Sequence, residues 1–326
     1  MEEQEGQENA DRANPEGLLY HYTAQDGLLG ILEKKSIWAT HARYLNDASE
    51  FDLGWRKARS ILLERIGQRD IPDGGRSFKQ SLINRHNAFL ETLARIDPLN
   101  PEFYTFCMTD DRASDPNNLG FEGDRLSQWR GYSRGGYGFS LGFDANALRR
   151  SLSESGDALQ SIRPCEYVEA RQNDKISALV DSHLDKFIAE YSTTSTGSAE
   201  YKIGRSKKLT ELLIHMYLEF VEFGMFIKDH GFREENEWRA TFLAEGRGKR
   251  AFRKGTFGLT PYLPVYLDLS KFPSPLKRIV VGPSPHKAEA VKAVKMLLEK
   301  LEIQIKNEDL PDGVEVVPSK IPYRNW

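Results

Sequence analysis

The sequence predicts an α+β fold with a mixed or largely antiparallel sheet, and three observations support this. Segments with the alternation of β-strands dominate both ends of the chain, while helical periodicity is concentrated between them. Strands and helices do not take turns along the chain, which argues against repeated βαβ units. The 326 residues, of which 39% are hydrophobic and 11% aromatic, can bury a substantial core.

The chain is predicted to consist of an acidic tail and one domain. Residues 1–17 are predicted to be disordered, because the first 16 residues carry six acidic side chains, one arginine and no apolar run. Residues 18–326 are predicted to form a single domain that contains a helical insertion at about 171–229. No internal repeat is visible in the sequence.

The N-terminal half combines short strands with amphipathic helices. Over residues 48–66, apolar side chains recur at steps of four and three, which is the spacing of one helix face. These side chains are Phe51, Trp55, Ala58, Leu62 and Ile66. The other elements predicted here are a strand at 18–23, a helix at 25–35, a strand at 36–40, a helix at 77–94 and a strand at 102–109.

The rest of the chain begins with a polar loop at 110–125 and a strand at 136–143. In this strand, bulky apolar side chains alternate with glycine and serine, which leaves room for a close approach to the backbone. Residues 201–229 are predicted to form a helix, whose apolar stripe is more typical of a core than of a cofactor site. The other predicted elements are helices at 171–191 and 286–301 and strands at 234–243, 262–269, 278–281, 303–305 and 314–317.

Glu237 is the first candidate for a functional residue. In the strand predicted over 234–243, the apolar side chains of Trp238 and Ala240 alternate with the polar side chains of Glu237 and Arg239. A strand with a core on one side can present a carboxylate to an active site from a rigid position. The same pattern also fits a structural ion pair between Glu237 and Arg239.

His21 is the second candidate. It shares one face of the first predicted strand with Thr23, while Tyr20 and Tyr22 occupy the other face. A single histidine on a strand is usually structural. The position before a short helix favours a functional role, because such junctions bring side chains to the edge of a sheet.

A further block, residues 43–51, contains Tyr44 and Asn46. Asn46 or Asp47 can cap the following helix, and Glu50 lies at capping-box spacing from Asp47. Capping explains the acidic residues without a ligand, and a single exposed aromatic such as Tyr44 needs no special explanation.

The block at 126–132 contains Ser127, Gln128, Trp129 and Arg130. Together these residues offer hydrogen-bond donors, an aromatic surface and a cation, which is the mixture that a nucleotide requires. The glycines that follow precede a strand and not a helix, so the block is neither a Rossmann nor a P-loop motif. A turn with a buried tryptophan is the alternative interpretation.

A basic run at 247–254 holds five positive charges, Phe252 and no acid. Such a run can contact a nucleic-acid backbone, although charge runs in loops are more often solvated. The residues of this possible nucleic-acid contact are Arg247, Lys249, Arg250, Arg253 and Lys254.

The sequence argues against several classes of protein. It contains no His-Glu-x-x-His pair, Gly-x-Ser-x-Gly elbow, P-loop or kinase signature. No apolar run approaches the roughly 20 residues of a membrane helix, and no secretory signal precedes the domain. The net charge of −3 does not favour a polyanionic partner. Cys107 and Cys165 lack neighbours at metal-ligand spacing, so we expect a cytoplasmic protein without a metal site.

Four blocks together resemble a bacterial family of unknown function. They are LYHYT at 19–23, YLNDASEF at 44–51, LSQWRGY at 126–132 and GFREENEWR at 231–239. The blocks occur in the family's order, and the resemblance covers about residues 18–324. Only the combination of the blocks is specific.

The segment at 19–38 also resembles the first motif of ADP-ribosyltransferases of the poly(ADP-ribose) polymerase, diphtheria-toxin and DNA-targeting toxin types. This resemblance implies a split-sheet core, NAD as co-substrate, an NAD-orienting His21 and a catalytic Glu237. Tyr44 competes with Ser127 and Trp129 for the middle motif. The residues that the resemblance implies as NAD contacts are His21, Tyr22, Thr23, Tyr44, Asn46, Ser127, Gln128, Trp129, Arg130 and Arg239.

Transfer of ADP-ribose from NAD is therefore the expected activity, and a role in toxin action or phage defence is what the toxin resemblance implies. The acceptor is open, with nucleic acid or protein as candidates. The alternatives are an NAD glycohydrolase, an enzyme similar to RNA 2′-phosphotransferases, and a nucleotide-binding module without catalysis.

Overall fold

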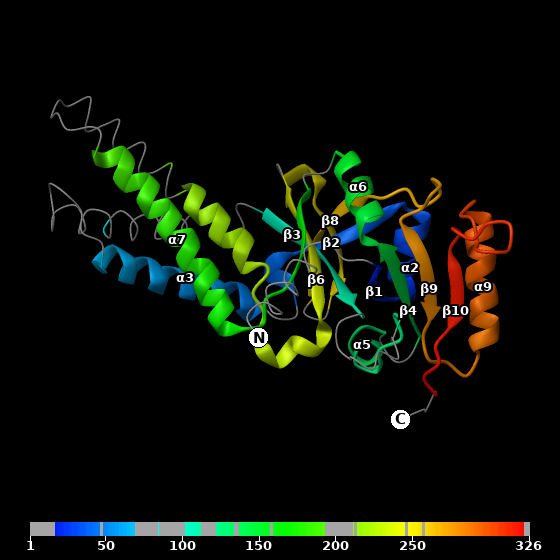
Figure 1. The fold of residues 1–326 in the computed structure, drawn as a ribbon. Helices are drawn as coiled ribbons and strands as arrows, with labels where there is room; N and C mark the ends of the chain where they lie inside the picture. The colour runs from blue at the N-terminus through cyan, green and yellow to red at the C-terminus, as the bar shows by residue number, and fades with distance from the viewer. Residues whose placement is uncertain are drawn as a thin grey trace. The chain divides into compact units, whose positions relative to one another are not determined.

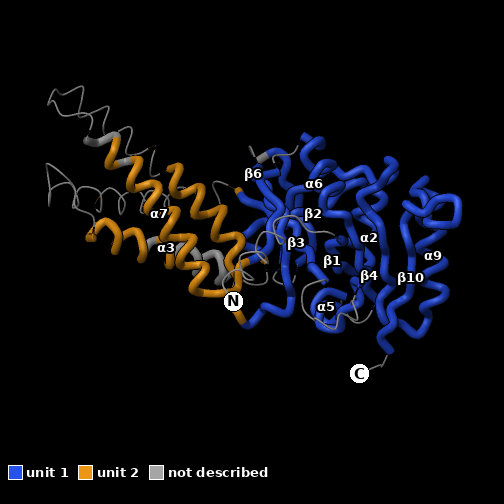
Figure 2. The backbone as a smooth tube through the Cα atoms, in the orientation of Figure 1, with its two compact units in different colours: residues 1–44, 103–165, 231–326 blue, residues 45–102, 166–230 orange. Residues whose placement is uncertain are grey.

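The computed structural model describes most of the chain in two compact units (Figure 2). Unit 1 comprises residues 1–44, 103–165 and 231–326, and unit 2 comprises residues 45–102 and 166–230. The described residues are 17–45, 48–68, 84, 102–111, 122–133, 137–156, 159–192, 211, 214–244, 247–255 and 258–322. The predicted acidic tail, except Gly17, and the predicted helix at 77–94, except Asn84, lie outside them.

Unit 1 is built on one ten-stranded sheet (Figure 1). The strand order is β10-β9-β4-β1-β3-β2-β8-β7, and β6 pairs with β3 and β5. Most pairs are antiparallel, and β10 pairs with β9 in parallel, so the predicted α+β class is confirmed. The strands are β1 (Leu18–Ala24), β2 (Ser36–His41), β3 (Glu102–Asp110), β4 (Gly138–Asp144), β5 (Leu159–Pro164), β6 (Glu237–Ala244), β7 (Ala251–Gly255), β8 (Gly258–Tyr266), β9 (Leu276–Val281) and β10 (Glu315–Pro318).

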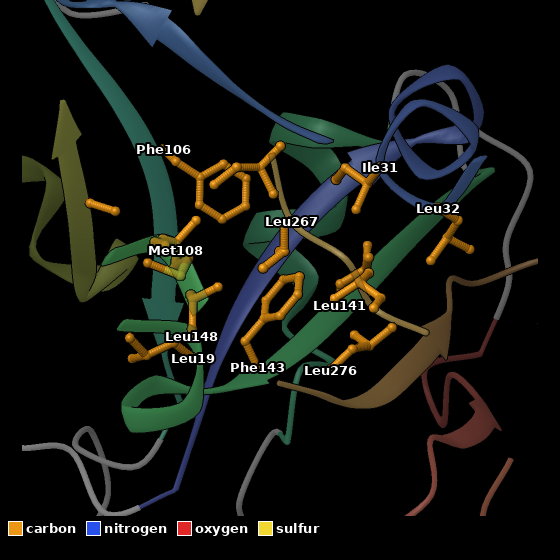
Figure 3. Packing of buried hydrophobic residues seen from close by; sticks show 14 of the residues in the cluster. Leu19, Ile31, Leu32, Phe106, Met108, Leu141, Phe143, Leu148, Leu267 and Leu276 are labelled. Carbon is orange, nitrogen blue, oxygen red and sulfur yellow. The ribbon is translucent and has the colours of Figure 1, made fainter. Parts of the chain in front are cut away.

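Helices contribute apolar side chains to one face of this sheet. The main core includes residues from α2, α6 and α9 together with alternate residues of β1, β3, β4 and β6. Figure 3 shows Phe106 and Met108 of β3 near Phe143 and Leu148, with Ile31 and Leu32 of α2 beside Leu141. The helical segments of unit 1 are α2 (Gln25–Glu33), η1 (Ala42–Tyr44), α5 (Leu126–Tyr132), α6 (Ala145–Glu154), η2 (His230–Glu235), η3 (Arg247–Lys249) and α9 (Lys287–Lys300).

Several elements differ from the sequence prediction. The basic run at 247–254 forms η3 and most of β7, and residues 126–132 form the helix α5. Helix α6 and strand β5 were not predicted; α6 is marked in the sequence by Asp144, whose side chain accepts a hydrogen bond from Ala147 N (2.7 Å) as an N-cap. The strand predicted at 303–305 is reduced to a bridge between Ile305 and Val314.

The space beside the glycines of β4 is filled by the protein's own side chains. A Cβ at Gly142 would lie 2.7 Å from the Tyr20 ring, and a Cβ at Gly138 would lie 2.3 Å from Ser133 Cβ. A Cβ at Gly282, which follows β9, would lie 3.1 Å from the ring of Trp129. The glycine stripe therefore serves packing and does not mark a ligand site.

Unit 2 has its own helical core. Helices α3 (Ala48–Gln68) and α7 (Glu169–Ser192) bring Ala58, Leu62 and Ile66 together with Ile176 and Val180. Three members of the predicted stripe at 201–229 join the same core; they are Met216, Phe220 and Ile227. The segment predicted as an insertion thus lies in unit 2, and the proposed domain boundary stays a prediction. In the described ranges, no helix combines the length and apolar character needed to cross a bilayer.

Candidate functional site

His21 lies where the sheet divides. β1 pairs with β3 only through Leu19 and Tyr20, whereas β2 pairs with β3 through Thr40 and His41. Just beyond the last pair of β1 and β3, His21 Nδ1 bonds the carbonyl oxygen of Cys107 (2.8 Å). The imidazole thus replaces a backbone bond where the two strands separate.

This contact fixes the tautomer of the neutral His21 ring. A carbonyl oxygen only accepts hydrogen bonds, so Nδ1 carries a proton, and in the neutral ring Nε2 then keeps a lone pair. Burial lowers the pKa of His21 to about 4; the Cys107 bond opposes this effect, and the Arg253 guanidinium adds to it. His21 is therefore a neutral hydrogen-bond acceptor at pH 7.

The lowered pKa makes stability depend on pH. Between pH 6.5 and about 4 the unfolded chain binds a proton at His21 that the folded chain does not, so stability falls as pH falls. His21→Gln, whose amide can still donate to Cys107, is expected to flatten this part of the profile. Urea unfolding at pH 7 and pH 4.5 measures the difference, and equal pH dependence in both proteins would contradict the lowered pKa.

A group of aromatic and basic residues lies on and beside the neighbouring strands β2, β8 and β7. The rings of Trp38 on β2 and Tyr262 on β8 lie 5.0 Å apart at 36°. The Arg253 guanidinium carbon on β7 and Lys34 Nζ each lie 5.9 Å from the Trp38 ring. Arg253 Nη2 also donates to Thr40 Oγ1 (2.7 Å). Sequence reasoning did not find this group, because it depends on the order β2-β8-β7.

Glu237 forms a buried ion pair with Arg239 on the same strand. Arg239 Nε donates to Glu237 Oε1 (2.8 Å) and Nη2 donates to Oε2 (3.0 Å), and the residues are 3% and 6% exposed, respectively. Burial lowers the pKa of Arg239, but its electrostatic interactions with Cys165, Glu237 and Cys107 and its hydrogen bonds to Glu237 outweigh burial and raise this pKa well above its usual value. The two-point contact holds both side chains in one geometry.

The structure does not bring His21 and Glu237 together. Trp238 and Ala240 lie in the main core, so Glu237 points to the opposite face of β6. His21 pairs across the ladder with Leu141 of that core, and its ring lies 4.3 Å from Phe106. Among the described residues no hydrogen bond or ion pair joins His21 to Glu237, and β3 lies between their strands.

The residues of α5 divide into two pairs. Gln128 and Trp129 are buried, whereas Ser127 and Arg130 are exposed. Trp129 packs edge-on against Tyr22 at 4.9 Å between ring centroids, in a cluster with Tyr20 and Val280. Its ring is therefore a core element, and the buried-tryptophan alternative describes it better than the predicted nucleotide contact does.

Asp124 connects α5 to a distant part of the chain. Its Oδ1 accepts hydrogen bonds from Trp129 Nε1 (2.8 Å) and Ser319 Oγ (2.6 Å), and its Oδ2 accepts one from Lys320 N (2.6 Å). We call these contacts the Asp124 clamp. The clamp provides a partner for the indole N–H of Trp129, whose ring packs in the cluster with Tyr22, so the hydrogen-bonding group of this buried side chain is satisfied within the protein.

Most of the other residues predicted to contact NAD have contacts within the protein. The buried Tyr22 hydroxyl accepts a hydrogen bond from Arg125 N (3.0 Å). A Cβ at Gly27 would lie 1.9 Å from Thr23 Oγ1, so the threonine hydroxyl occupies the space beside α2. Tyr44 is 46% exposed, and its ring lies edge-on to His41. Asn46 lies outside the described residues.

The basic run does not form a single surface. Arg253 turns to the face of Trp38 and Thr40, whereas its neighbours Phe252 and Lys254 are exposed. Lys249 is exposed and Arg250 half-buried, and the Arg247 side chain lies outside the described part. The nucleic-acid contact stays a prediction.

One family model matches part of this chain. No curated protein and no solved structure matches it, so the comparisons return no ADP-ribosyltransferase. The family model that matches residues 128–240 covers Gln128, Trp129, Arg130, Glu237 and Arg239, and it excludes His21 and Tyr44. Residues 128–240 are thus a domain described as a protein of unknown function (DUF2971).

Proposed function

We propose that the chain binds NAD beside His21 and transfers its ADP-ribose group to an acceptor. The observation that carries this proposal is the neutral His21 imidazole at the division of the sheet, with a lone pair on Nε2. This lone pair can accept a hydrogen bond from a ribose hydroxyl. The proposal includes that the core has the split sheet of ADP-ribosyltransferases.

The chemistry requires few protein groups. The bond between ribose C1′ and the nicotinamide nitrogen breaks, and both electrons go to that nitrogen, which loses its positive charge. A lone pair of the acceptor forms the new bond to C1′, and the acceptor's proton passes to water. Hydrogen bonds to a sugar hydroxyl that strengthen in an oxocarbenium-like transition state contribute several kcal/mol in related glycosyl chemistry. His21 provides such a bond.

Glu237 receives a positioning role in this proposal, in place of the catalytic role expected from the sequence. Both carboxylate oxygens bind Arg239, and the side chain leaves β6 on the face away from the main core. β6 pairs with β3, and the Cys107 carbonyl of β3 accepts the hydrogen bond from His21. In the proposal, Glu237 and Arg239 stabilise β6 and act on His21 only through this strand pairing.

NAD turnover by three proteins tests the proposal. Nicotinamide release and transfer of labelled ADP-ribose are measured for the wild type, His21→Gln and Glu237→Gln. We expect His21→Gln to lower turnover about 100-fold, which is typical of a lost general-base or hydrogen-bonding group. Glu237→Gln is expected to stay within about tenfold per folded molecule, whereas a residue that stabilises charge in the transition state would cost roughly 10²–10³.

The outcomes separate the possible roles. A large loss in Glu237→Gln with an unchanged melting temperature would return the catalytic role to Glu237. Release of free ADP-ribose without a labelled acceptor would identify a glycohydrolase. Absence of NAD binding to the folded wild type would refute the proposal.

A second function is favoured by the buried Glu237–Arg239 pair. Both oxygens of this buried carboxylate bind Arg239, so the pair can stabilise the fold without taking part in catalysis. A nucleotide-binding module without turnover fits that observation. Tight NAD binding that neither releases nicotinamide nor depends on Glu237 would support the module.

A further inference from the structure

Trp38 and Tyr262 form a half-buried aromatic pair outside the main core, in which one edge of the Trp38 ring packs against Gly30 of α2. Their neighbours in sequence, Ile37, Ala39 and Leu263, are buried in the main core, and alternation turns the two aromatic rings to the other face. Both rings are half-buried and lie 5.0 Å apart. A pair of partly exposed rings on neighbouring strands can pack against a planar ligand ring, as in single-strand nucleic-acid recognition.

Arg253 supplies a fixed cation beside this surface. Its guanidinium is half-buried, lies 5.9 Å from the Trp38 ring, and is held by the bond from Nη2 to Thr40 Oγ1. Lys34 adds a second, exposed cation at 5.9 Å from the same ring. A planar guanidinium with several donors matches the oxygen atoms of a phosphate, and its attachment to Thr40 reduces the ordering required on binding.

The aromatic pair and the cation lie on three neighbouring strands. Trp38 is on β2, Tyr262 on β8 and Arg253 on β7, and the sheet order β2-β8-β7 brings them together. An aromatic surface and a phosphate-binding cation match two parts of a nucleotide, its base and its phosphate.

We propose that Trp38, Tyr262 and Arg253 form a nucleotide subsite, in which the two aromatic residues bind the base and Arg253 binds a phosphate. The subsite rests on the proposed NAD site only for the identity of the dinucleotide. Binding of a mononucleotide such as AMP requires no turnover.

Calorimetric titration with NAD, AMP, adenosine and inorganic pyrophosphate tests the subsite. Arg253→Gln is expected to weaken AMP about 10- to 100-fold, the range for a lost hydrogen bond to a charged group, and to leave adenosine unchanged. Lys254→Gln is the matched control, because it removes the same charge from the exposed neighbour on β7. Arg253→Lys, which keeps the charge and loses the planar donors, should give an intermediate affinity.

The aromatic part has its own pair of variants. Tyr262→Leu is expected to weaken AMP and adenosine alike, by about tenfold, as for one lost base–aromatic contact. Tyr266→Leu on the same strand is the control, because that ring is 48% exposed. Melting temperatures establish that each variant is folded, and Trp38→Phe provides a conservative replacement for the second ring.

Three results would overturn the subsite: no binding of AMP or NAD to the folded wild type at millimolar concentration, equal losses in Arg253→Gln and Lys254→Gln, or pyrophosphate binding as tight as that of AMP. The two proposals fail separately. Turnover that depends on His21 with normal NAD affinity in Arg253→Gln would remove the subsite alone. Arg253-dependent AMP binding without NAD turnover would remove the transferase function alone.

Discussion

Arg239→Met is expected to lower the free energy of unfolding by about 3–5 kcal/mol, which is typical of breaking one partner out of a buried ion pair. Methionine has a similar length but no charge, so the Glu237 carboxylate would stay buried without the guanidinium that binds both of its oxygens. The desolvation cost of that carboxylate is the physical reason for the loss.

Urea unfolding followed by tryptophan fluorescence measures this effect. Arg163→Met is the matched control, because Arg163 is the register partner of Arg239 on β5 and is exposed. The double variant Glu237→Met/Arg239→Met removes both charges and is expected to recover most of the stability. A loss below about 1 kcal/mol in Arg239→Met, the range of surface pairs, would show that solvent screens this ion pair.

Trp238→Ala tests the opposite face of the same strand. Trp238 is 1% exposed within the main core, and truncation of a buried tryptophan to alanine costs about 3–5 kcal/mol through lost burial and the remaining cavity. Phe252→Ala on β7 is the control, because its ring is 57% exposed. Thermal unfolding should show a large decrease in Tm for Trp238→Ala and little change for the control, and similar decreases would contradict the assigned faces of β6.

The local pattern of the sequence predicts much of this fold. Alternation identified the core face of β6 through Trp238 and Ala240, and helical spacing identified Leu62 and Ile66 of α3 as core residues. The Glu237–Arg239 pair was one of two interpretations of its strand, because neighbouring residues on one face of a strand are in reach of each other. These features depend on contacts that are close in sequence.

The candidate site depends on contacts that the sequence does not reveal. The partner of His21 is a backbone carbonyl 86 residues away, and no residue type marks a carbonyl that lacks a strand partner. Arg253 and Trp38 meet only because β8 pairs with both β2 and β7. The alternation of Arg253 with exposed Phe252 and Lys254 was a signal that could have separated this arginine from the rest of the basic run.

The Asp124 clamp also imposes an order on the assembly of the protein. Ser319 and Lys320 are 195 and 196 residues beyond Asp124, so during synthesis from the N-terminus the aspartate is made long before two of its three donors. Until residues 319 and 320 have left the ribosome, Trp129 is the one donor of these three that can reach this carboxylate. The packing of α5 against β1 is therefore completed late in synthesis, after the strands of the sheet that precede residue 319 have been made.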